Sequence, residues 1–155
     1  MRILIALDAS EHSERALDFV TRMRWPAGSR VMVLSVLQPV AGTLSAFEPG
    51  VASAGLLEEQ RGRLEEVVAR AEGTLRESGF STEGRVVAGD PREALVQTAR
   101  SERADLLVVG SHGHSGLTKL MLGSVSSHVV THAPCSVLVV KQPPRAPGGG
   151  KERQE

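Results

Sequence analysis

Short apolar runs alternate along the chain with longer segments whose apolar residues recur at helical spacing. Continuous apolar runs of this length are typical of strands that are buried on both faces of a parallel sheet. They predict five strands, at residues 3–7, 31–37, 82–88, 105–109 and 137–141. The periodic segments predict four helices, between residues 10 and 26 and at residues 56–78, 90–101 and 123–132.

Polar capping residues and glycines mark the ends of these helices. Ser10 is placed as the N-cap of the first helix. Asp90, Pro91 and Glu93 form the pattern of a capping box, with proline at the first helical position. Gly79 follows the second helix, where glycine commonly ends a helix in the left-handed conformation.

Strict alternation of strands and helices indicates right-handed βαβ crossovers. We therefore expect a single α/β domain at residues 1–141, a doubly wound, five-stranded parallel sheet with helices on both faces. A length of 155 residues is typical of one domain. Residues 38–55, rich in glycine, proline and small side chains, predict a long loop. Residues 142–155 predict a disordered tail, because they cannot bury apolar surface.

Composition narrows the classes of function. Lys and Arg number 18, as do Asp and Glu, and only four residues are aromatic, so neither a basic nucleic-acid footprint nor a stacking platform is present. A single cysteine excludes an internal disulfide framework. No apolar run approaches the roughly 20 residues that span a bilayer. We expect a cytoplasmic protein without a direct nucleic-acid or membrane partner.

A glycine-rich stretch holds the strongest candidate for binding chemistry. Gly110 and Gly113 follow a predicted strand, and Gly123 and Ser124 open a predicted helix. Glycines allow close approach of a ligand, successive N–H groups form anion-binding hollows, and a helix N-terminus adds a positive dipole. Together they predict a phosphate cradle, to which Ser124 and Ser126 would add hydroxyl donors. The alternative is a glycine-rich connection without a ligand.

Several common nucleotide and hydrolase motifs are absent from the sequence. The turn after the first strand, at residues 8–12, contains no glycine, which excludes the dinucleotide fingerprint G-x-G-x-x-G. No G-x-x-x-x-G-K-[ST] string marks a P-loop, and no G-x-S-x-G string marks a serine hydrolase. The predicted phosphate cradle therefore belongs to none of these three motif classes.

The spacing of the glycines resembles that of a known family. Gly110, Gly113, Gly123 and Ser124 meet the pattern G-x-x-G-x₉-G-[ST], which is similar to the ATP-binding motif of the universal stress protein (UspA-like) family. The opening strand, the Gly-Asp-Pro turn and the closing A-P-C-S-V-L-V-V-K also fit. The resemblance covers nearly the whole predicted domain.

The resemblance implies a Rossmann-like fold of the adenine-nucleotide α-hydrolase type that binds ATP, ADP or AMP, with Mg²⁺ accompanying the nucleotide. It also implies a homodimer formed through the last strand, Val137 to Lys141. By position, contacts to the base and ribose come from the strand ends Ala6, Asp8, Val36 and Val109. Contacts to the ribose and phosphates come from Gly110, His112, Gly113, Gly123, Ser124, Val125 and Ser126.

Two features depart from the common pattern of that family. His112 and His114 stand where relatives often carry Arg or Lys. A neutral imidazole, with an ordinary pKa of about 6.5, neutralises phosphate charge poorly at higher pH. We therefore expect modest nucleotide affinity, or affinity that rises at lower pH, unless Lys119 compensates. Ser136 stands where many relatives have proline, which leaves an N–H on the strand used for dimerisation.

Other candidate groups have simpler interpretations. Asp8 could accept a phosphoryl group, but the acidic partners and the lysine of such a site are not apparent. The H-x-H string of the glycine loop, or His128 with His132, could bind a metal, yet such sites normally need a third protein ligand. Surface histidines are the favoured interpretation. Cys135 is favoured as a small core residue.

The sequence predicts an adenine-nucleotide-binding protein that acts in stress response or signalling through nucleotide-dependent conformation or partner binding. No general base or nucleophile stands beside the cradle, so an enzyme is not expected, although slow ATP hydrolysis stays open. A dimeric adaptor with the same fold but no nucleotide is the alternative from another class. The inducing stress, the partner and the preferred nucleotide are not identified by the sequence.

Overall fold

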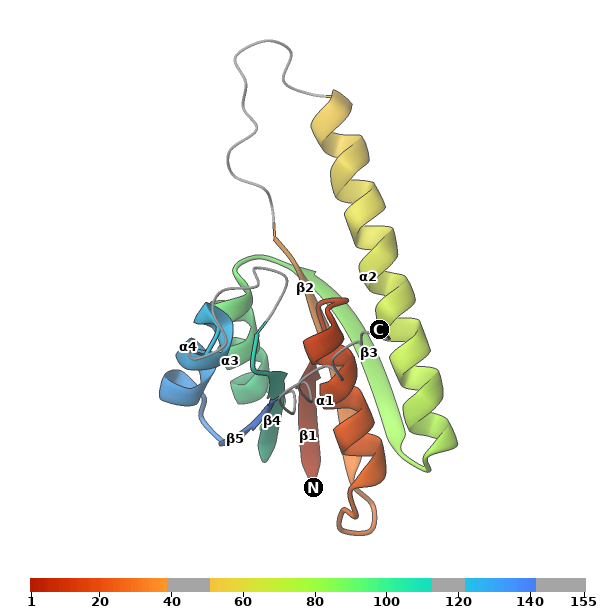
Figure 1. Cartoon of the computed structure of the whole chain (residues 1–155), viewed down its shortest axis with the longest axis vertical. Helices are drawn as coiled ribbons and strands as arrows, with labels where there is room; N and C mark the ends of the chain where they lie inside the picture. The colour runs from red at the N-terminus through yellow and green to blue at the C-terminus, as the bar shows by residue number, and fades with distance from the viewer. Residues whose placement is uncertain (39–50, 113–121, 142–155) are drawn as a thin grey trace, which may run out of the picture.

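Strands and helices alternate through the computed structural model, which describes residues 1–38, 51–112 and 122–141, with the side chains of α2 described from residue 55 (Figure 1). The elements are β1 (Arg2–Ala6), α1 (Glu11–Arg22), β2 (Arg30–Leu37), α2 (Val51–Glu77), β3 (Ser81–Ala88), α3 (Pro91–Ser101), β4 (Leu106–Gly110), α4 (Ser124–His132) and β5 (Ser136–Val140). Gly113, His114, Lys119, most of the predicted loop and the predicted tail lie outside the described residues.

The five strands form one parallel sheet in the order β3-β2-β1-β4-β5. β1 lies at the centre, with Leu4 level with Met32 of β2 on one side and Leu107 of β4 on the other. The chain winds outward from β1 to β3 and then crosses to β4, so the strand order reverses between β1 and β4. This confirms the predicted doubly wound sheet and places its reversal, where such sheets bind ligands, at the carboxyl ends of β1 and β4.

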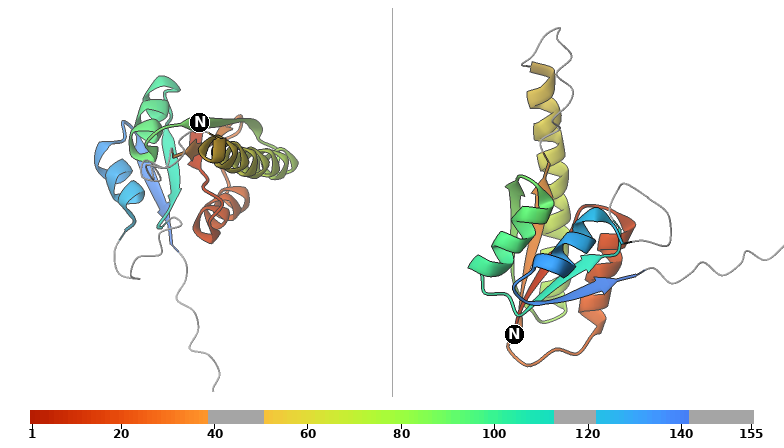
Figure 2. Two further views of the ribbon diagram at one scale, coloured as in Figure 1. Left: turned by 90° about the horizontal axis from the view of Figure 1, so that it is seen from above. Right: turned by 90° about the vertical axis from the view of Figure 1, so that its left-hand side faces the viewer.

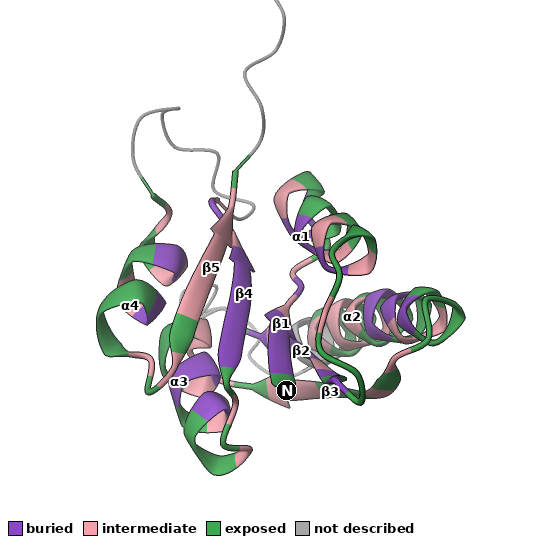
Figure 3. Ribbon diagram, turned by 90° about the horizontal axis from the view of Figure 1, so that it is seen from below, coloured by how far each residue is buried: buried purple, intermediate pink, exposed green. Residues whose placement is uncertain are grey.

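Helices cover both faces of the sheet, as predicted (Figure 2 and Figure 3). α1 and α2 pack on one face, and α3 and α4 pack on the other. Ile3 and Ile5 of β1 enter the core under α1 and α2, whereas Leu4 enters the core under α3 and α4. Because alternate residues feed two cores, the central strands are continuous apolar runs in the sequence.

α1 and α3 begin at the caps that the sequence predicts. The Ser10 side chain accepts a hydrogen bond from the N–H of Ser13 at the start of α1. The Asp90 side chain accepts one from the N–H of Arg92 at the start of α3, and Pro91 occupies the first turn. Each cap pairs one of the N–H groups that a helix start leaves without an acceptor.

Details of three helix starts differ from the prediction. A capping box also requires the Glu93 side chain to accept a hydrogen bond from the N–H of Asp90, and this bond is not found among the described residues. The Glu93 carboxylate lies 3.4 Å from Nε2 of His128 on α4 instead. α4 begins with Gly123 as its N-cap, so Ser124 is its first helical residue, one position later than predicted. α2 begins at Val51, within the predicted loop. Its first residues are small and lack a capping signal, so the apolar pattern alone does not reveal them.

α2 packs closely on β3. A Cβ atom added at Gly84 would lie 2.2 Å from Cγ1 of Val68, closer than such atoms approach one another. The glycine that weakens the strand pattern in the sequence is therefore what allows the helix to approach the sheet. No helix within the described residues is both long and apolar enough to cross a membrane.

Candidate functional site

A cavity of about 540 Å³ opens at the carboxyl edge of the sheet, where the strand order reverses. Its volume lies in the usual range for small-molecule sites, roughly 300–1,000 Å³. Every residue that the resemblance implies as a nucleotide contact lines it, except Gly113, which lies outside the described residues. The lining set is Ala6, Asp8, Val36, Val109, Gly110, His112, Gly123, Ser124, Val125 and Ser126.

The strand ends make one part of the cavity apolar. Ala6, Val36 and Val109 stand at the ends of three neighbouring strands and pack against the core under α3 and α4. Leu34 and Leu95, both buried, also line the cavity. This surface suits the flat apolar face of a base without any aromatic residue.

The start of α4 makes another part of the cavity an anion site. Its N-cap, Gly123, has no side chain that could cap the helix. The N–H groups of Ser124, Val125 and Ser126 belong to the first turn, so they have no acceptor within the helix. The helix dipole adds roughly half a positive charge at this end. All four residues line the cavity, and the N–H groups of Ser124, Val125 and Ser126 suit a phosphate.

Hydrogen bonds hold the start of α4 against β4 and β5. The N–H of Ser111 donates to the carbonyl of Val140, and the N–H of Gly123 donates to the carbonyl of Ser111, both at 2.9 Å. The buried hydroxyl of Ser126 donates to the carbonyl of Gly110 at 2.7 Å. Its hydrogen is therefore occupied, and Ser126 offers a phosphate its N–H, not the hydroxyl donor expected from the sequence.

Gly110 is packed against α1. A Cβ atom at this position would lie 2.9 Å from backbone atoms of His12. The sequence suggests that glycine is needed here for close approach of a ligand. The structure adds a second reason, because only glycine lets the end of β4 meet the first turn of α1 without displacement.

Asp8 helps to begin α1. Its Oδ1 accepts hydrogen bonds from the N–H and the hydroxyl of Ser10, at 3.1 and 2.5 Å. Ala9, between them, has a φ of 63°, a left-handed conformation that costs a residue with a Cβ about 1–2 kcal/mol. Strained turns of this kind cluster at ligand sites, and both Asp8 and Ala9 line the cavity.

α2 contributes lining residues that the sequence analysis did not identify. Gln60, Arg63 and Leu64 reach the cavity from one face of this helix. Arg63 is also paired with Glu59, one turn away. Arg63 therefore brings a cation from α2 to the cavity. Helical spacing places these residues together, but it does not say which face meets β2.

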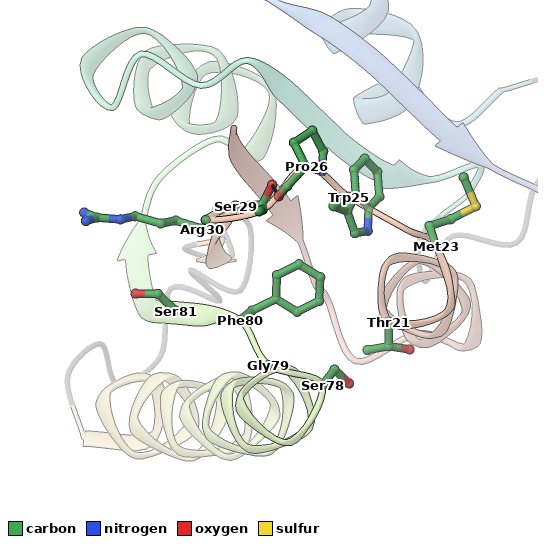
Figure 4. Close-up of a pocket in the computed structure, with 12 residues that line it drawn as sticks. Thr21, Met23, Trp25, Pro26, Ser29, Arg30, Ser78, Gly79, Phe80 and Ser81 are labelled. Carbon is green, nitrogen blue, oxygen red and sulfur yellow. Dashed lines mark hydrogen bonds between the residues drawn. The ribbon is translucent and has the colours of Figure 1, made fainter.

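A second hollow, of about 510 Å³, lies at the opposite edge of the sheet (Figure 4). The turns that precede β2 and β3 form it, with Trp25 and Phe80 among its lining residues. Several of its side-chain donors are already used, because Trp25 Nε1 and the hydroxyls of Ser29 and Ser78 each donate to a nearby backbone carbonyl. It lies away from the reversal of strand order, so the cavity at the carboxyl edge is the better candidate site.

The remaining candidate groups take structural positions. His128 and His132 stack on α4, with ring centres 4.2 Å apart. Cys135 packs against the core under α3 and α4, and burial raises the pKa of its thiol, so it remains protonated at neutral pH. Among the described residues, no group of three or more His, Cys, Asp or Glu side chains is placed to hold a metal ion.

Known proteins resemble both the sequence and the fold. The family model described as the universal stress protein family matches residues 1–141. A universal stress protein of Thermus aquaticus is 37% identical over 142 residues, which cover 90% of this chain and 97% of the relative. Universal stress protein MJ0577 of Methanocaldococcus jannaschii is 30% identical over 158 residues, which cover 91% and 94% of the two chains.

Solved structures of universal stress proteins also match the fold of this chain. A structure of MJ0577 matches with a TM-score of 0.81 over 92% of this chain and 96% of that chain. A universal stress protein solved in complex with cAMP matches with a TM-score of 0.64 and 25% identity, over 91% and 96% of the two chains.

Proposed function

The chain belongs to the universal stress protein family, and from this membership we propose that it binds an adenine nucleotide, ATP or AMP, in the cavity at the carboxyl edge. The observation that carries the proposal is an apolar surface and an uncapped helix N-terminus lining one cavity. The apolar surface can hold a purine base, and the helix N-terminus can hold phosphates. The relative solved with cAMP supports an adenine nucleotide as the ligand class.

The strand ends receive the base and ribose in this proposal. Ala6, Val36 and Val109 pack on the base, and the Asp8 carboxylate accepts a hydrogen bond from the base or from a ribose hydroxyl. Apolar contact supplies affinity, while the single carboxylate supplies orientation, which is the usual division in small-molecule sites.

The loop after β4 and the first turn of α4 receive the phosphates. The N–H groups of Ser124, Val125 and Ser126 donate to phosphate oxygens, with Gly110, His112, Gly113 and Gly123 beside them. Mg²⁺ accompanies the nucleotide and lowers the negative charge that the site must balance. Occupancy then alters conformation or partner binding in a cytoplasmic stress response or signalling pathway.

The experiment that tests the phosphate site removes one N–H from it. Gly123 has a ψ of 160°, the extended conformation that a residue before proline prefers, and proline is favoured at the first helical position. Ser124→Pro should therefore leave α4 intact while deleting a donor. A charged hydrogen bond contributes about 1.5–3 kcal/mol, so ATP binding in calorimetric titration should weaken roughly 10- to 100-fold.

The matched control is Ser124→Ala, which removes the hydroxyl and keeps the N–H. It should weaken binding less than Ser124→Pro does. If Ser124→Pro bound ATP as tightly as the wild type, the phosphates would not bind at the start of α4. Absence of ATP and AMP binding by the folded wild type would favour the dimeric adaptor. Repeated ATP turnover that depends on Asp8 or His112 would favour a hydrolase.

We also propose that the chain forms a homodimer through β5. β5 and β3 are the two edge strands of the sheet. β3 carries the exposed charged residues Glu83 and Arg85, and charges on an edge discourage pairing. β5 instead presents four half-buried aliphatic residues, Val137 to Val140. This edge therefore offers a second copy apolar surface and backbone groups that no strand within the described residues pairs.

A further inference from the structure

Two histidines from distant parts of the sequence meet beside the candidate site. His12 lies in the first turn of α1, and His112 follows β4 and lines the cavity. Their ring centres are 5.3 Å apart and the rings are tilted by 48°. The close packing of Gly110 on the backbone of His12 brings these two segments together.

Each of these rings has a buried nitrogen that lacks a hydrogen-bond partner within the described part of the chain. Nδ1 of His12 and Nε2 of His112 find no hydrogen-bond partner among the described residues. A buried polar atom left in this state costs roughly 1–3 kcal/mol. Two such atoms on adjacent rings leave room for a shared partner, which none of the described residues supplies.

We propose that His12 and His112 bind a divalent transition metal ion, with Zn²⁺ as the representative, through Nδ1 of His12 and Nε2 of His112. Zn–N bonds are about 2.0–2.1 Å long, so two imidazoles on one tetrahedral ion have ring centres roughly 5 Å apart. The observed 5.3 Å matches this spacing. The described residues supply these two ligands and no third, so the proposed site has one protein ligand fewer than the usual catalytic zinc site. Water or phosphate oxygens fill the remaining positions.

The surroundings of the pair fit a metal ligand. Nδ1 of His112 lies 3.1 Å from the hydroxyl of Ser111. When Nδ1 donates its hydrogen to that hydroxyl, Nε2 keeps its lone pair for a metal, which is the usual support of a ligating histidine. Glu11 and Glu14 lie in the same first turn as His12, and their negative charges offset the positive end of the α1 dipole, which would otherwise disfavour a cation there.

His128 and His132 provide an internal comparison. Their rings stack with centres 4.2 Å apart and only 22° between the planes. Nδ1 of His132 already lies 2.9 Å from the carbonyl of His128. Stacked rings direct their nitrogens alongside one another, not toward a common ion, so this pair serves as the matched control.

The test is a Zn²⁺ titration of the full, nucleotide-free chain by calorimetry. His12→Gln and His112→Gln keep hydrogen-bonding capacity but remove the imidazole. Each should weaken Zn²⁺ binding by more than the roughly 10- to 100-fold that loss of an outer-shell partner typically costs, while His132→Gln should leave it unchanged. Equal binding by His12→Gln and the wild type, or loss of binding in His132→Gln alone, would overturn the proposal, as would absence of Zn²⁺ binding by the wild type.

Nitrogen NMR of the wild type gives a readout that does not depend on whether a variant folds. Zn²⁺ should shift the resonances of Nδ1 of His12 and Nε2 of His112. Shifts confined to His114, His128 or His132 would contradict the assignment. Because no nucleotide is present, this result is independent of the ATP titration, and either proposal can fail while the other stands.

Discussion

Ser126 ties the beginning of α4 to the end of β4 through one buried hydroxyl. Its hydrogen bond to the carbonyl of Gly110 measures 2.7 Å, and the side chain is 4% exposed. Ser126→Ala leaves that carbonyl without this partner, so the free energy of unfolding should fall by about 1–3 kcal/mol. Urea unfolding measures the change.

Ser127 provides the control for this prediction. It is exposed and lies in the same turn of α4. Ser127→Ala should change stability by less than about 0.5 kcal/mol. A variant Ser126→Ala as stable as Ser127→Ala would mean that the hydroxyl is dispensable for holding the loop.

The lining residues at the strand ends follow from the sequence, but their exact contacts do not. Ala6, Asp8, Val36 and Val109 stand at strand ends, and parallel topology alone brings such ends to one edge. Arg63 reaches the same cavity from α2, and its position depends on how that helix crosses the sheet. The contact of His12 with His112 likewise depends on tertiary packing, since neither residue lies in a motif that includes the other.

At the scale of the elements, the start of α3 carries a pH-dependent contribution. The Arg92 side chain and N–H lower the pKa of Asp90 from 3.8 to about 2. Because the pKa is lower in the folded state, the ionised carboxylate stabilises the fold above about pH 4. That stabilisation is lost as the pH falls from about 4 to 2.

Asp90→Asn separates this effect from other titrations. Asparagine still accepts the capping hydrogen bond but has no charge to lose. Between about pH 4 and 2, the variant should lose less stability than the wild type in urea unfolding. Equal losses in the two proteins would show that the Asp90–Arg92 pair contributes nothing to acid sensitivity.

The packing of α2 on β3 gives a second prediction at this scale. Gly84→Ala places a Cβ 2.2 Å from Cγ1 of Val68, and such overpacking typically costs about 1–3 kcal/mol. Gly73→Ala, on α2 with no atom within 4 Å of the added Cβ, should instead stabilise by up to about 1 kcal/mol. Thermal unfolding measures the stability of both variants. If Gly84→Ala were as stable as the wild type, α2 would be free to shift on the sheet.

Strands and most helix ends could be predicted because local signals agree with the apolar pattern. Asp90 with Pro91, and Ser10, mark helix starts in the sequence as they do in the structure. Val51 at the start of α2 could not be predicted, because no cap marks it. Glu93 shows the opposite case, where a local capping pattern is present but the side chain faces His128 of a neighbouring helix.

At the scale of the whole molecule, the two edges of the sheet make the proposed dimer testable. Val139→Asp puts a charge on β5, so the chain should become monomeric in light scattering after size exclusion. Glu83→Lys, on the exposed edge of β3, should leave the dimer intact. Circular dichroism establishes that each variant is folded. A dimer that survives Val139→Asp would point to a different interface.

The length of α2 has a consequence for the candidate site. Its 27 residues extend about 40 Å, whereas the eight residues of β3 extend about 27 Å, and the helix projects beyond the sheet (Figure 1). None of its described side chains before Val67 is buried. Amide hydrogens near Gln60 and Leu64 should therefore exchange with solvent through local fraying, well below the free energy of global unfolding. A bound ligand would slow that exchange, and part of its binding free energy would go into ordering the cavity wall.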